Sequence, residues 1–141
     1  MEAQVQKSSS SSRHAFWEKQ FQFDNRFHRA GKTRDEEVVT ICEGMIDILA
    51  ACFSVPSKDL RSQERASACI SRIRQVGMYI THVGLGLSMK EVAAGFCRDR
   101  STVVYACHLI EDLRDEPDFD KICSTVERIA CAAFGSAIAG R

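Results

Sequence analysis

Hydrophobic and polar residues follow each other at helical spacing along most of the chain after its first 34 residues. Residues 35–53 predict a helix with a broad apolar surface, and its acidic start suits a helix N-terminus. Residues 66–83 predict a long central helix. Residues 118–134 predict a final amphipathic helix, between a break at Pro117 and a stop at Gly135. The pattern therefore predicts an all-α fold, a small multi-helix domain.

Two short helices joined by a tight turn are predicted in the middle of the chain. Ser88 followed three residues later by Glu91 forms a capping box, so the first of these helices begins there. Cys97 and Arg98 form the turn, and Asp99 is suited to be the N-cap of the second helix. The stretch has the outline of a helix-turn-helix.

The second of these helices separates into an apolar and a polar side. The positions that can face inward are Val103, Val104, Ala106, Cys107 and Ile110. The polar positions near its N-terminus face outward, and they are Arg100, Ser101, Thr102 and Tyr105. Short hydrogen-bonding side chains and an arginine at this place are typical of a helix that enters the major groove. From these residues alone, an ordinary helical hairpin inside an all-α core is an equal alternative.

The amino-acid composition agrees with the predicted small helical domain. The chain of 141 residues is 45% hydrophobic, which suits one globular domain with a tail. We expect no membrane span and no secretory signal. The seven cysteines form no C-x-x-C pair and no spacing typical of zinc ligands, so buried free thiols in a reducing cytosol are expected. No metal site is predicted.

Net charge is zero, but the charges are unevenly distributed. Residues 57–105 carry eight bases and four acids, whereas residues 35–56 carry five acids and no base. Residues 106–141 are also acidic, with seven acids and four bases. The positive segment thus coincides with the predicted helix-turn-helix and the helix before it. Local potential decides attraction to phosphate, although the zero total predicts weak non-specific binding.

The first 34 residues combine a run of serines with aromatic and basic residues. The serine run predicts disorder. The aromatic residues that follow are Phe16, Trp17, Phe21, Phe23 and Phe27. They fit an arm that docks on the domain or a partner, or an arm that stacks on nucleic acid. A short helix that covers the core is the favoured interpretation.

Three motifs carry a resemblance to a known family. R-Q-x-x-M-Y at residues 74–79, S-x-x-E-V at residues 88–92 and F-x-R-D-R-S-T-V-x-x-A at residues 96–106 stand in this order. Together they resemble the C-terminal DNA-binding domain of the bacterial replication initiator DnaA. The resemblance covers roughly residues 38–114, about half of the chain. It implies a fold similar to that domain and to Trp-repressor-like helix-turn-helix proteins.

The resemblance assigns two residues to DNA. Arg74 occupies the place of an arginine that enters the minor groove in that family. Asp99 occupies the place of an aspartate that approaches a cytosine edge in the major groove. Without the resemblance, Arg74 is a surface arginine on the polar side of its helix, and Asp99 is equally well explained as a cap alone.

Residue chemistry adds further contacts. Arg100 can bind guanine with two hydrogen bonds, and Ser101 and Thr102 can reach a phosphate or a thymine methyl group. The backbone N–H groups at Met89 and Lys90 suit a DNA phosphate, to which Lys90 adds charge. The residues expected at DNA are Arg74, Ser88, Met89, Lys90, Asp99, Arg100, Ser101, Thr102 and Tyr105.

Two departures from the family bear on specificity. The family has two glycines before its R-D, whereas this chain has Cys97 alone, so its turn is one residue shorter. Arg100 and Tyr105 stand where the family has histidines that contact bases or phosphates. We therefore expect the docking to be kept and the preferred sequence to differ from that of the family.

The sequence contains no G-x-x-x-x-G-K-[ST] loop and no convincing nucleophile–base arrangement. We predict no enzyme, no cofactor and no nucleotide or membrane partner. The predicted function is that of a stand-alone cytoplasmic, nucleoid-associated regulator without an ATPase module. Its partner would be double-stranded DNA, and it would act in transcription or in replication initiation. A homodimer is left open, and the alternative is a helical adaptor that kept the fold and binds protein.

The expected organisation has three parts. Residues 1–34 are a flexible basic and aromatic arm, and residues 35–114 are the helix-turn-helix domain. Residues 115–141 are a C-terminal helix and tail that pack on this domain.

Overall fold

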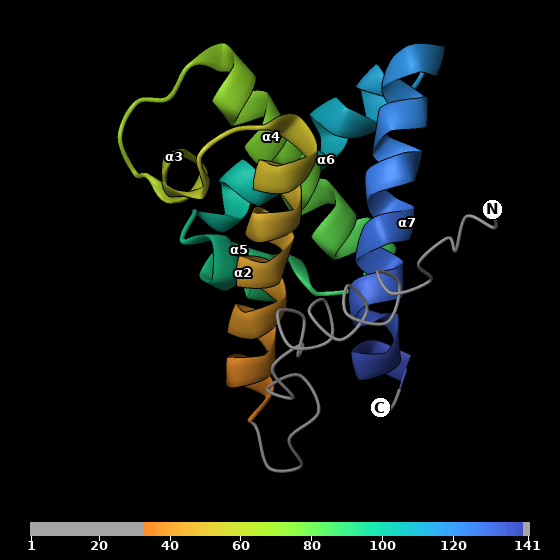
Figure 1. Cartoon of the computed structure of the whole chain (residues 1–141). Helices are drawn as coiled ribbons and strands as arrows, with labels where there is room; N and C mark the ends of the chain where they lie inside the picture. Colours follow the sequence, from red (N-terminus) through yellow and green to blue (C-terminus); the bar gives the residue numbers. More distant parts are fainter. Residues whose placement is uncertain (1–32, 140–141) are drawn as a thin grey trace, which may run out of the picture. The chain divides into compact units, whose positions relative to one another are not determined.

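The computed structural model describes residues 33–139, and their side chains up to residue 135. Residues 1–32, which make up nearly all of the predicted N-terminal arm, lie outside the described range, so the predictions for this arm are not tested. Within the described range the regular structure is all helical, which confirms the predicted fold class (Figure 1). Its elements are α2 (Arg34–Phe53), α3 (Ser57–Arg61), α4 (Ala68–Tyr79), the π-helical η2 (Ile80–Gly84), α5 (Met89–Phe96), α6 (Arg100–Leu113) and α7 (Pro117–Ala139).

Helix α2 packs against most of the other elements of the domain. It contacts α3, α4, α5 and α7. Its start is fixed by a capping box in which Thr33 Oγ1 accepts from the Glu36 N–H and Glu36 accepts from the Thr33 N–H. Its end is fixed by Ser54, which adopts the left-handed conformation with φ of 53°. The predicted helix over residues 35–53 is confirmed.

Two glycines let helices approach α2 closely. A Cβ atom placed on Gly95 of α5 would lie 2.2 Å from the Cys42 Sγ atom of α2. A Cβ atom on Gly77 of α4 would lie 2.4 Å from a methyl carbon of Leu49. Real Cβ atoms do not approach other atoms so closely, so the Gly95 contact requires glycine, whereas at Gly77 the Leu49 methyl group would have to turn away.

The central helix changes its geometry near its end. The sequence predicts one helix over residues 66–83, but α4 ends at Tyr79 and continues as the π-helical η2. The hydroxyl of buried Thr81 donates to the Gly77 carbonyl at 2.7 Å, which satisfies it inside the core. His82 Nδ1 lies 2.6 Å from the Leu87 carbonyl oxygen and ties η2 to the segment before α5.

Helix α7 is longer than the sequence pattern predicts. Pro117 is its first residue rather than a break before it, because the first helical position needs no N–H donor. Gly135 does not stop the helix, which continues to Ala139. The buried face of α7 consists of Cys123, Val126, Ala130 and Phe134. It packs against α2 and η2 (Figure 1).

A polar cluster fastens α7 to the other helices. The Arg114 guanidinium at the end of α6 donates to Asp120 at 2.6 Å, to Glu127 at 3.4 Å and to the Tyr79 hydroxyl at 3.2 Å. The Tyr79 hydroxyl in turn donates to Glu111 at 2.6 Å. Helices α4, α6 and α7 are therefore joined at one point.

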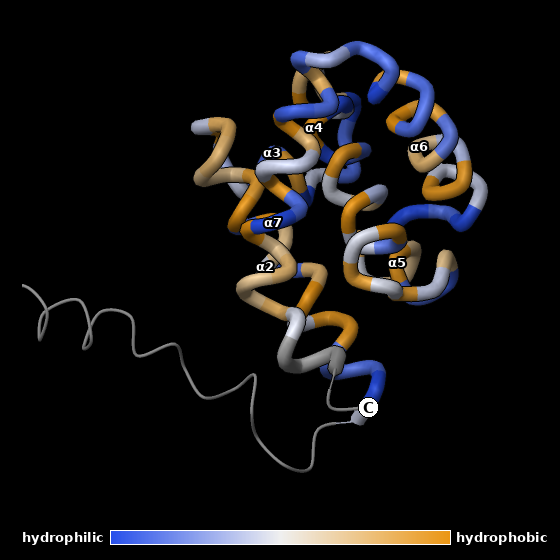
Figure 2. Tube along the Cα trace, turned by 90° about the vertical axis from the view of Figure 1, so that its right-hand side faces the viewer, coloured by the Kyte–Doolittle hydropathy of each residue, from blue (hydrophilic) through white to orange (hydrophobic). Residues whose placement is uncertain are grey.

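Figure 2 shows hydrophobic and hydrophilic residues interspersed along each helix, as expected of amphipathic helices around one core. All seven cysteines are free, but only Cys42, Cys107 and Cys123 are buried, which corrects the expectation of buried thiols. No helix between residues 33 and 139 has both the length and the apolar character to cross a membrane. Over the same residues, no three His, Cys, Asp or Glu side chains are grouped so that they could hold a metal.

Candidate nucleic-acid interface

The start of α5 is built by the capping box that the sequence predicts. Ser88 Oγ accepts from the Glu91 N–H at 3.2 Å, and Glu91 Oε2 accepts from the Ser88 N–H at 2.9 Å. Within the described chain, the backbone N–H groups of Met89 and Lys90 have no hydrogen-bond acceptor. Ser88 and Lys90 are exposed. These N–H groups can therefore donate hydrogen bonds to an anion from outside.

A charged pair that the sequence does not predict lies at this helix start. Arg34, the first residue of α2, donates to both carboxylate oxygens of Glu91, at 2.6 and 3.0 Å. Hydrogen bonds from Arg34 hold the pKa of Glu91 below its usual value, and the bond from the Ser88 backbone acts in the same direction. The pair offsets the negative charge of Glu91 beside the free N–H groups. No sequence signal links these residues, which lie 57 positions apart.

The turn between α5 and α6 depends on Cys97. This residue adopts the left-handed conformation, with φ of 53° and ψ of 47°. The N–H groups of Cys97 and Arg98 donate back to the carbonyls of Ala94 and Ala93, which closes the end of α5. A residue with a side chain adopts this conformation at a cost of about 1 kcal/mol relative to glycine.

Helix α6 presents the polar side that the sequence predicts. Its buried residues are Val103, Ala106, Cys107 and Ile110, while Val104 is half-buried. Arg100, Ser101, Thr102 and Tyr105 are all exposed, and 63% of Tyr105 is accessible. Asp99 is the N-cap by its backbone, but its side chain makes no capping hydrogen bond. The Asp99 carboxylate therefore remains available at the start of the helix.

Arg74 does not stand on a polar, solvent-facing side. It is 8% exposed, and its guanidinium donates to the backbone carbonyls of Leu60 at 2.9 Å, Asp59 at 3.1 Å and Ser62 at 3.5 Å. Burial lowers the pKa of Arg74, and the nearby Arg98 lowers it further. The description of Arg74 as an ordinary surface arginine is thus wrong: it holds the end of α3 against α4.

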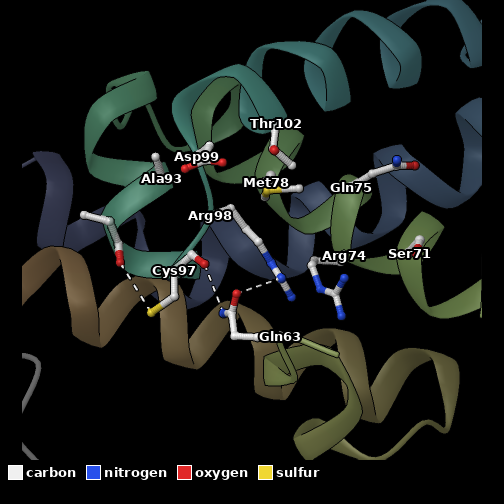
Figure 3. Close-up of a pocket in the computed structure, with 11 residues that line it drawn as sticks. Gln63, Ser71, Arg74, Gln75, Met78, Ala93, Cys97, Arg98, Asp99 and Thr102 are labelled. Atoms are coloured by element: carbon white, nitrogen blue, oxygen red, sulfur yellow. Dashed lines mark hydrogen bonds between the residues drawn. The ribbon is translucent and has the colours of Figure 1, made fainter. Parts of the chain in front are cut away.

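Two residues outside the predicted set connect the same segment to the turn. Gln63 donates to the Cys97 carbonyl at 3.0 Å and accepts from Arg98 Nη1 at 3.1 Å (Figure 3). Arg98 Nη2 also donates to the Ser62 carbonyl at 2.5 Å. The connection between α3 and α4 and the turn between α5 and α6 are therefore held together. Sequence spacing alone could not reveal these contacts, because they join residues 34 to 36 positions apart.

These segments enclose a hollow of about 600 Å³ beside the start of α6. Its lining includes Gln63, Arg74, Gln75, Arg98, Asp99 and Thr102 (Figure 3). The structure therefore brings three of the predicted residues, Arg74, Asp99 and Thr102, around one hollow. The remaining predicted residues, Ser88, Met89, Lys90, Arg100, Ser101 and Tyr105, do not line it.

The charge of this hollow is mostly positive. In the part of the chain that the structure describes, neither Arg74 nor Arg98 forms a salt bridge with a carboxylate. Their partners are carbonyl oxygens and the Gln63 amide, which leave both positive charges in place. Asp99 is the acidic residue that lines the hollow with them.

Comparison with known proteins gives one family. The family described as bacterial DnaA protein helix-turn-helix matches residues 42–110. The chromosomal replication initiator protein DnaA of Trichormus variabilis is 32% identical over 82 residues, which are 57% of this chain and 18% of that protein. DnaA 2 of Chlamydia trachomatis is 35% identical over 69 residues, 49% of this chain and 15% of that protein.

A longer match is found with DnaA of Pseudothermotoga lettingae, which is 26% identical over 111 residues. It covers 79% of this chain and 23% of that protein. The chain thus spans less than a quarter of the length of these relatives. The family match at residues 42–110 contains the turn, most of α6 and the residues that line the hollow.

Proposed function

Since residues 42–110 belong to the family of bacterial DnaA helix-turn-helix domains, we propose that the chain binds double-stranded DNA in a sequence-specific manner. It would regulate transcription or the initiation of replication by occupying its site, without ATPase chemistry of its own. One observation carries the proposal: the first turns of α6 expose polar side chains, while the opposite side of the same helix is buried. A helix in this situation is free to enter the major groove.

The residues that would read bases lie at the start of α6. Arg100 can donate two hydrogen bonds to a guanine, and the free Asp99 carboxylate can accept from a cytosine amino group. Ser101 and Thr102 are exposed and short enough to reach a phosphate or a thymine methyl group. Tyr105, one turn further on, offers an aromatic ring and a hydroxyl to the same groove.

The residues that would fix the position of the domain lie at the start of α5. The unbonded N–H groups of Met89 and Lys90 and the positive Lys90 side chain suit one backbone phosphate. Ser88 supports them through its capping box. A contact to phosphate adds affinity for all sequences alike, whereas α6 would supply the preference.

Arg74 also belongs to the proposed interface, in a different manner from the residues of α6. Entry into the minor groove would require its guanidinium to leave the carbonyls of Leu60, Asp59 and Ser62. Its charge lies beside the start of α6 even without this movement. We therefore propose that Arg74 favours DNA by its charge, with or without direct contact to bases.

Partners and location follow from this function. A single domain of this size reads few base pairs, so useful specificity needs a homodimer or clustered sites. The place of action would be the bacterial cytoplasm, at the nucleoid.

A second candidate function, a helical adaptor for another protein, is favoured by the outer face of α7. Ile122 and Ile129 are 46% and 41% exposed there. A hollow of about 510 Å³ beside Ile122 is lined mainly by apolar atoms of α2 and α7, including Phe53. An adaptor would bind no DNA with sequence preference.

The change Thr102→Glu tests the proposal. Thr102 is exposed in the first turn of α6, where an acidic residue favours the helix, so the fold should be kept. The added charge should weaken duplex binding at least about tenfold, because it would face the phosphates. The matched control is Thr125→Glu on α7, which should bind as the unaltered chain does. Equal binding by both variants in fluorescence anisotropy titrations would contradict the proposal.

A further inference from the structure

Two arginines of the hollow lie unusually close together. Arg74 Nη2 and Arg98 Nη2 both donate to the Ser62 carbonyl oxygen, at 3.5 and 2.5 Å. The two side chains come from α4 and from the turn, and their guanidinium groups lie near each other in Figure 3. Two positive charges in this position repel each other, and no carboxylate is paired with either in the described chain. An anion placed beside them would remove this repulsion.

One donor of this pair is unused. Arg98 Nε is buried and has no hydrogen-bond partner among the described residues. A buried donor without an acceptor is costly, and arginine presents its N–H groups in a planar fork that matches two oxygens of a phosphate. The turn thus holds a guanidinium whose charge and one N–H group are unsatisfied.

The surroundings of the pair suit one phosphate and its sugar. The hollow of about 600 Å³ is lined by further polar groups, among them Gln75 and Ser71 of α4. It lies beside the first turn of α6, where Thr102 contributes to its wall. Asp99 also lines it, but in Figure 3 its carboxylate lies apart from both guanidinium groups. A phosphate would therefore sit on the arginine side.

We propose that Arg98 and Arg74 form a binding site for one phosphate of the DNA backbone. The inference rests on the proposed function, since it names a further contact of the same interface. Arg98 makes the contact, and Gln63 and the Ser62 carbonyl hold its side chain in place. The site is distinct from the start of α5, because Ser88, Met89 and Lys90 do not line the hollow. Two backbone phosphates would thus be held, one at each place.

The first test compares Arg98→Ala, Arg98→Lys and the control Arg128→Ala, an exposed arginine of α7. Arg98→Ala should weaken binding about tenfold on every duplex and lower the slope of log affinity against log salt by about one. Arg98→Lys should keep the salt slope, because it keeps the charge. It should lose part of the affinity, because lysine lacks the planar set of donors of the guanidinium. Arg128→Ala should change neither quantity.

The second test places the contact on the DNA. Single phosphates of a bound duplex are replaced one at a time by neutral methylphosphonates. One replacement should weaken binding by the unaltered chain and have no effect on binding by Arg98→Ala. This loss of sensitivity distinguishes a contact from a structural role of Arg98, which would lower the melting temperature in both Arg98 variants and leave the phosphate profile unchanged.

The outcomes separate the inference from the function it rests on. If Arg98→Ala keeps the salt slope and the complete phosphate profile while Thr102→Glu abolishes binding, the phosphate site is wrong and DNA binding stands. If the unaltered chain binds no duplex at low salt, the proposed function fails and this inference fails with it. If Arg98→Ala does not fold, Arg98→Gln decides, because it removes the charge and keeps a polar side chain; an unchanged salt slope and phosphate profile in that variant would overturn the site.

Discussion

Replacement of Gly95 by alanine tests how closely α5 packs on α2. The added Cβ atom would lie 2.2 Å from Cys42 Sγ and 2.7 Å from Cys42 Cβ. Cys42 is fully buried, at 0% exposure, and a rotation of its side chain would not move the clashing Cβ atom. The backbone of α5, which carries the first half of the helix-turn-helix, would have to move away from α2.

Two effects of opposite sign set the magnitude. Overpacking a core costs about 1–3 kcal/mol, and replacing glycine by alanine within a helix gains about 1 kcal/mol. Because the clash involves the first atoms of a buried side chain rather than a flexible tip, the upper end of the cost applies. The free energy of unfolding should fall by about 2 kcal/mol. For a domain of this size the melting temperature should drop by about 8 °C.

The assay is thermal unfolding followed by circular dichroism, with Gly135→Ala as the matched control. Gly135 also lies in a helix, but a Cβ atom there would meet nothing within 4 Å. The control should therefore gain about 0.5–1 kcal/mol. Cys42→Ala should cost less in the Gly95→Ala background than in the unaltered chain, because it removes the clashing sulfur. If Gly95→Ala raises the melting temperature as Gly135→Ala does, the close packing is wrong.

Further predictions concern DNA, pH and thiol chemistry. Arg100→Ala should cost about 1–3 kcal/mol on the best duplex and relax preference at one base pair, whereas Lys90→Ala should weaken all duplexes alike and lower the salt slope by about one. The pKa of Glu91 lies below 4.5 in the folded chain, so its contribution to stability is present above that pH and lost as pH falls below it. Between pH 7 and pH 3, the melting temperature should fall less for Arg34→Ala than for the unaltered chain. Burial raises the pKa of Cys42 to about 12, so native alkylation at pH 8 should spare it and modify the exposed cysteines.

Each of these predictions has a contrary result. Equal effects of Arg100→Ala and Lys90→Ala on every duplex would contradict direct reading by α6. An acid-induced loss of stability as large in Arg34→Ala as in the unaltered chain would show that the Arg34 pair does not set the pKa of Glu91. Alkylation of Cys42 as fast as that of Cys52 would contradict its burial beneath α5.

The helices and their buried faces could be predicted because the sequence features that determine them are local. The capping box of Ser88 and Glu91 fixes the start of α5 from residues three positions apart. The apolar positions of α6 fix which side of the helix is buried, and the exposed side follows without further information. These two features already define the exposed face of α6 that the proposed function requires.

The ends of α7 could not be predicted, because the same residues have two uses. Proline breaks a helix in its interior but suits its first position, where Pro117 lies. Glycine often follows a helix, yet Gly135 is accommodated inside one. The local sequence does not distinguish the two uses of either residue.

The surroundings of the interface were the least predictable part. Arg74 has the helical position of a surface residue, but Asp59 and Leu60 of α3 and Ser62 after it supply three carbonyl acceptors. The contacts of Gln63 with the turn depend on the connection after α3. Such contacts arise from irregular segments, for which a sequence has no periodic signal.

The central claim, reading of DNA by α6, is tested most directly by selecting bound duplexes from a random pool at moderate salt. The unaltered chain and Arg100→Ala are used in parallel, and both are first confirmed to be folded by circular dichroism. We expect an enriched motif for the unaltered chain and the same motif with one base pair relaxed for Arg100→Ala. A folded chain that enriches no sequence would contradict the claim.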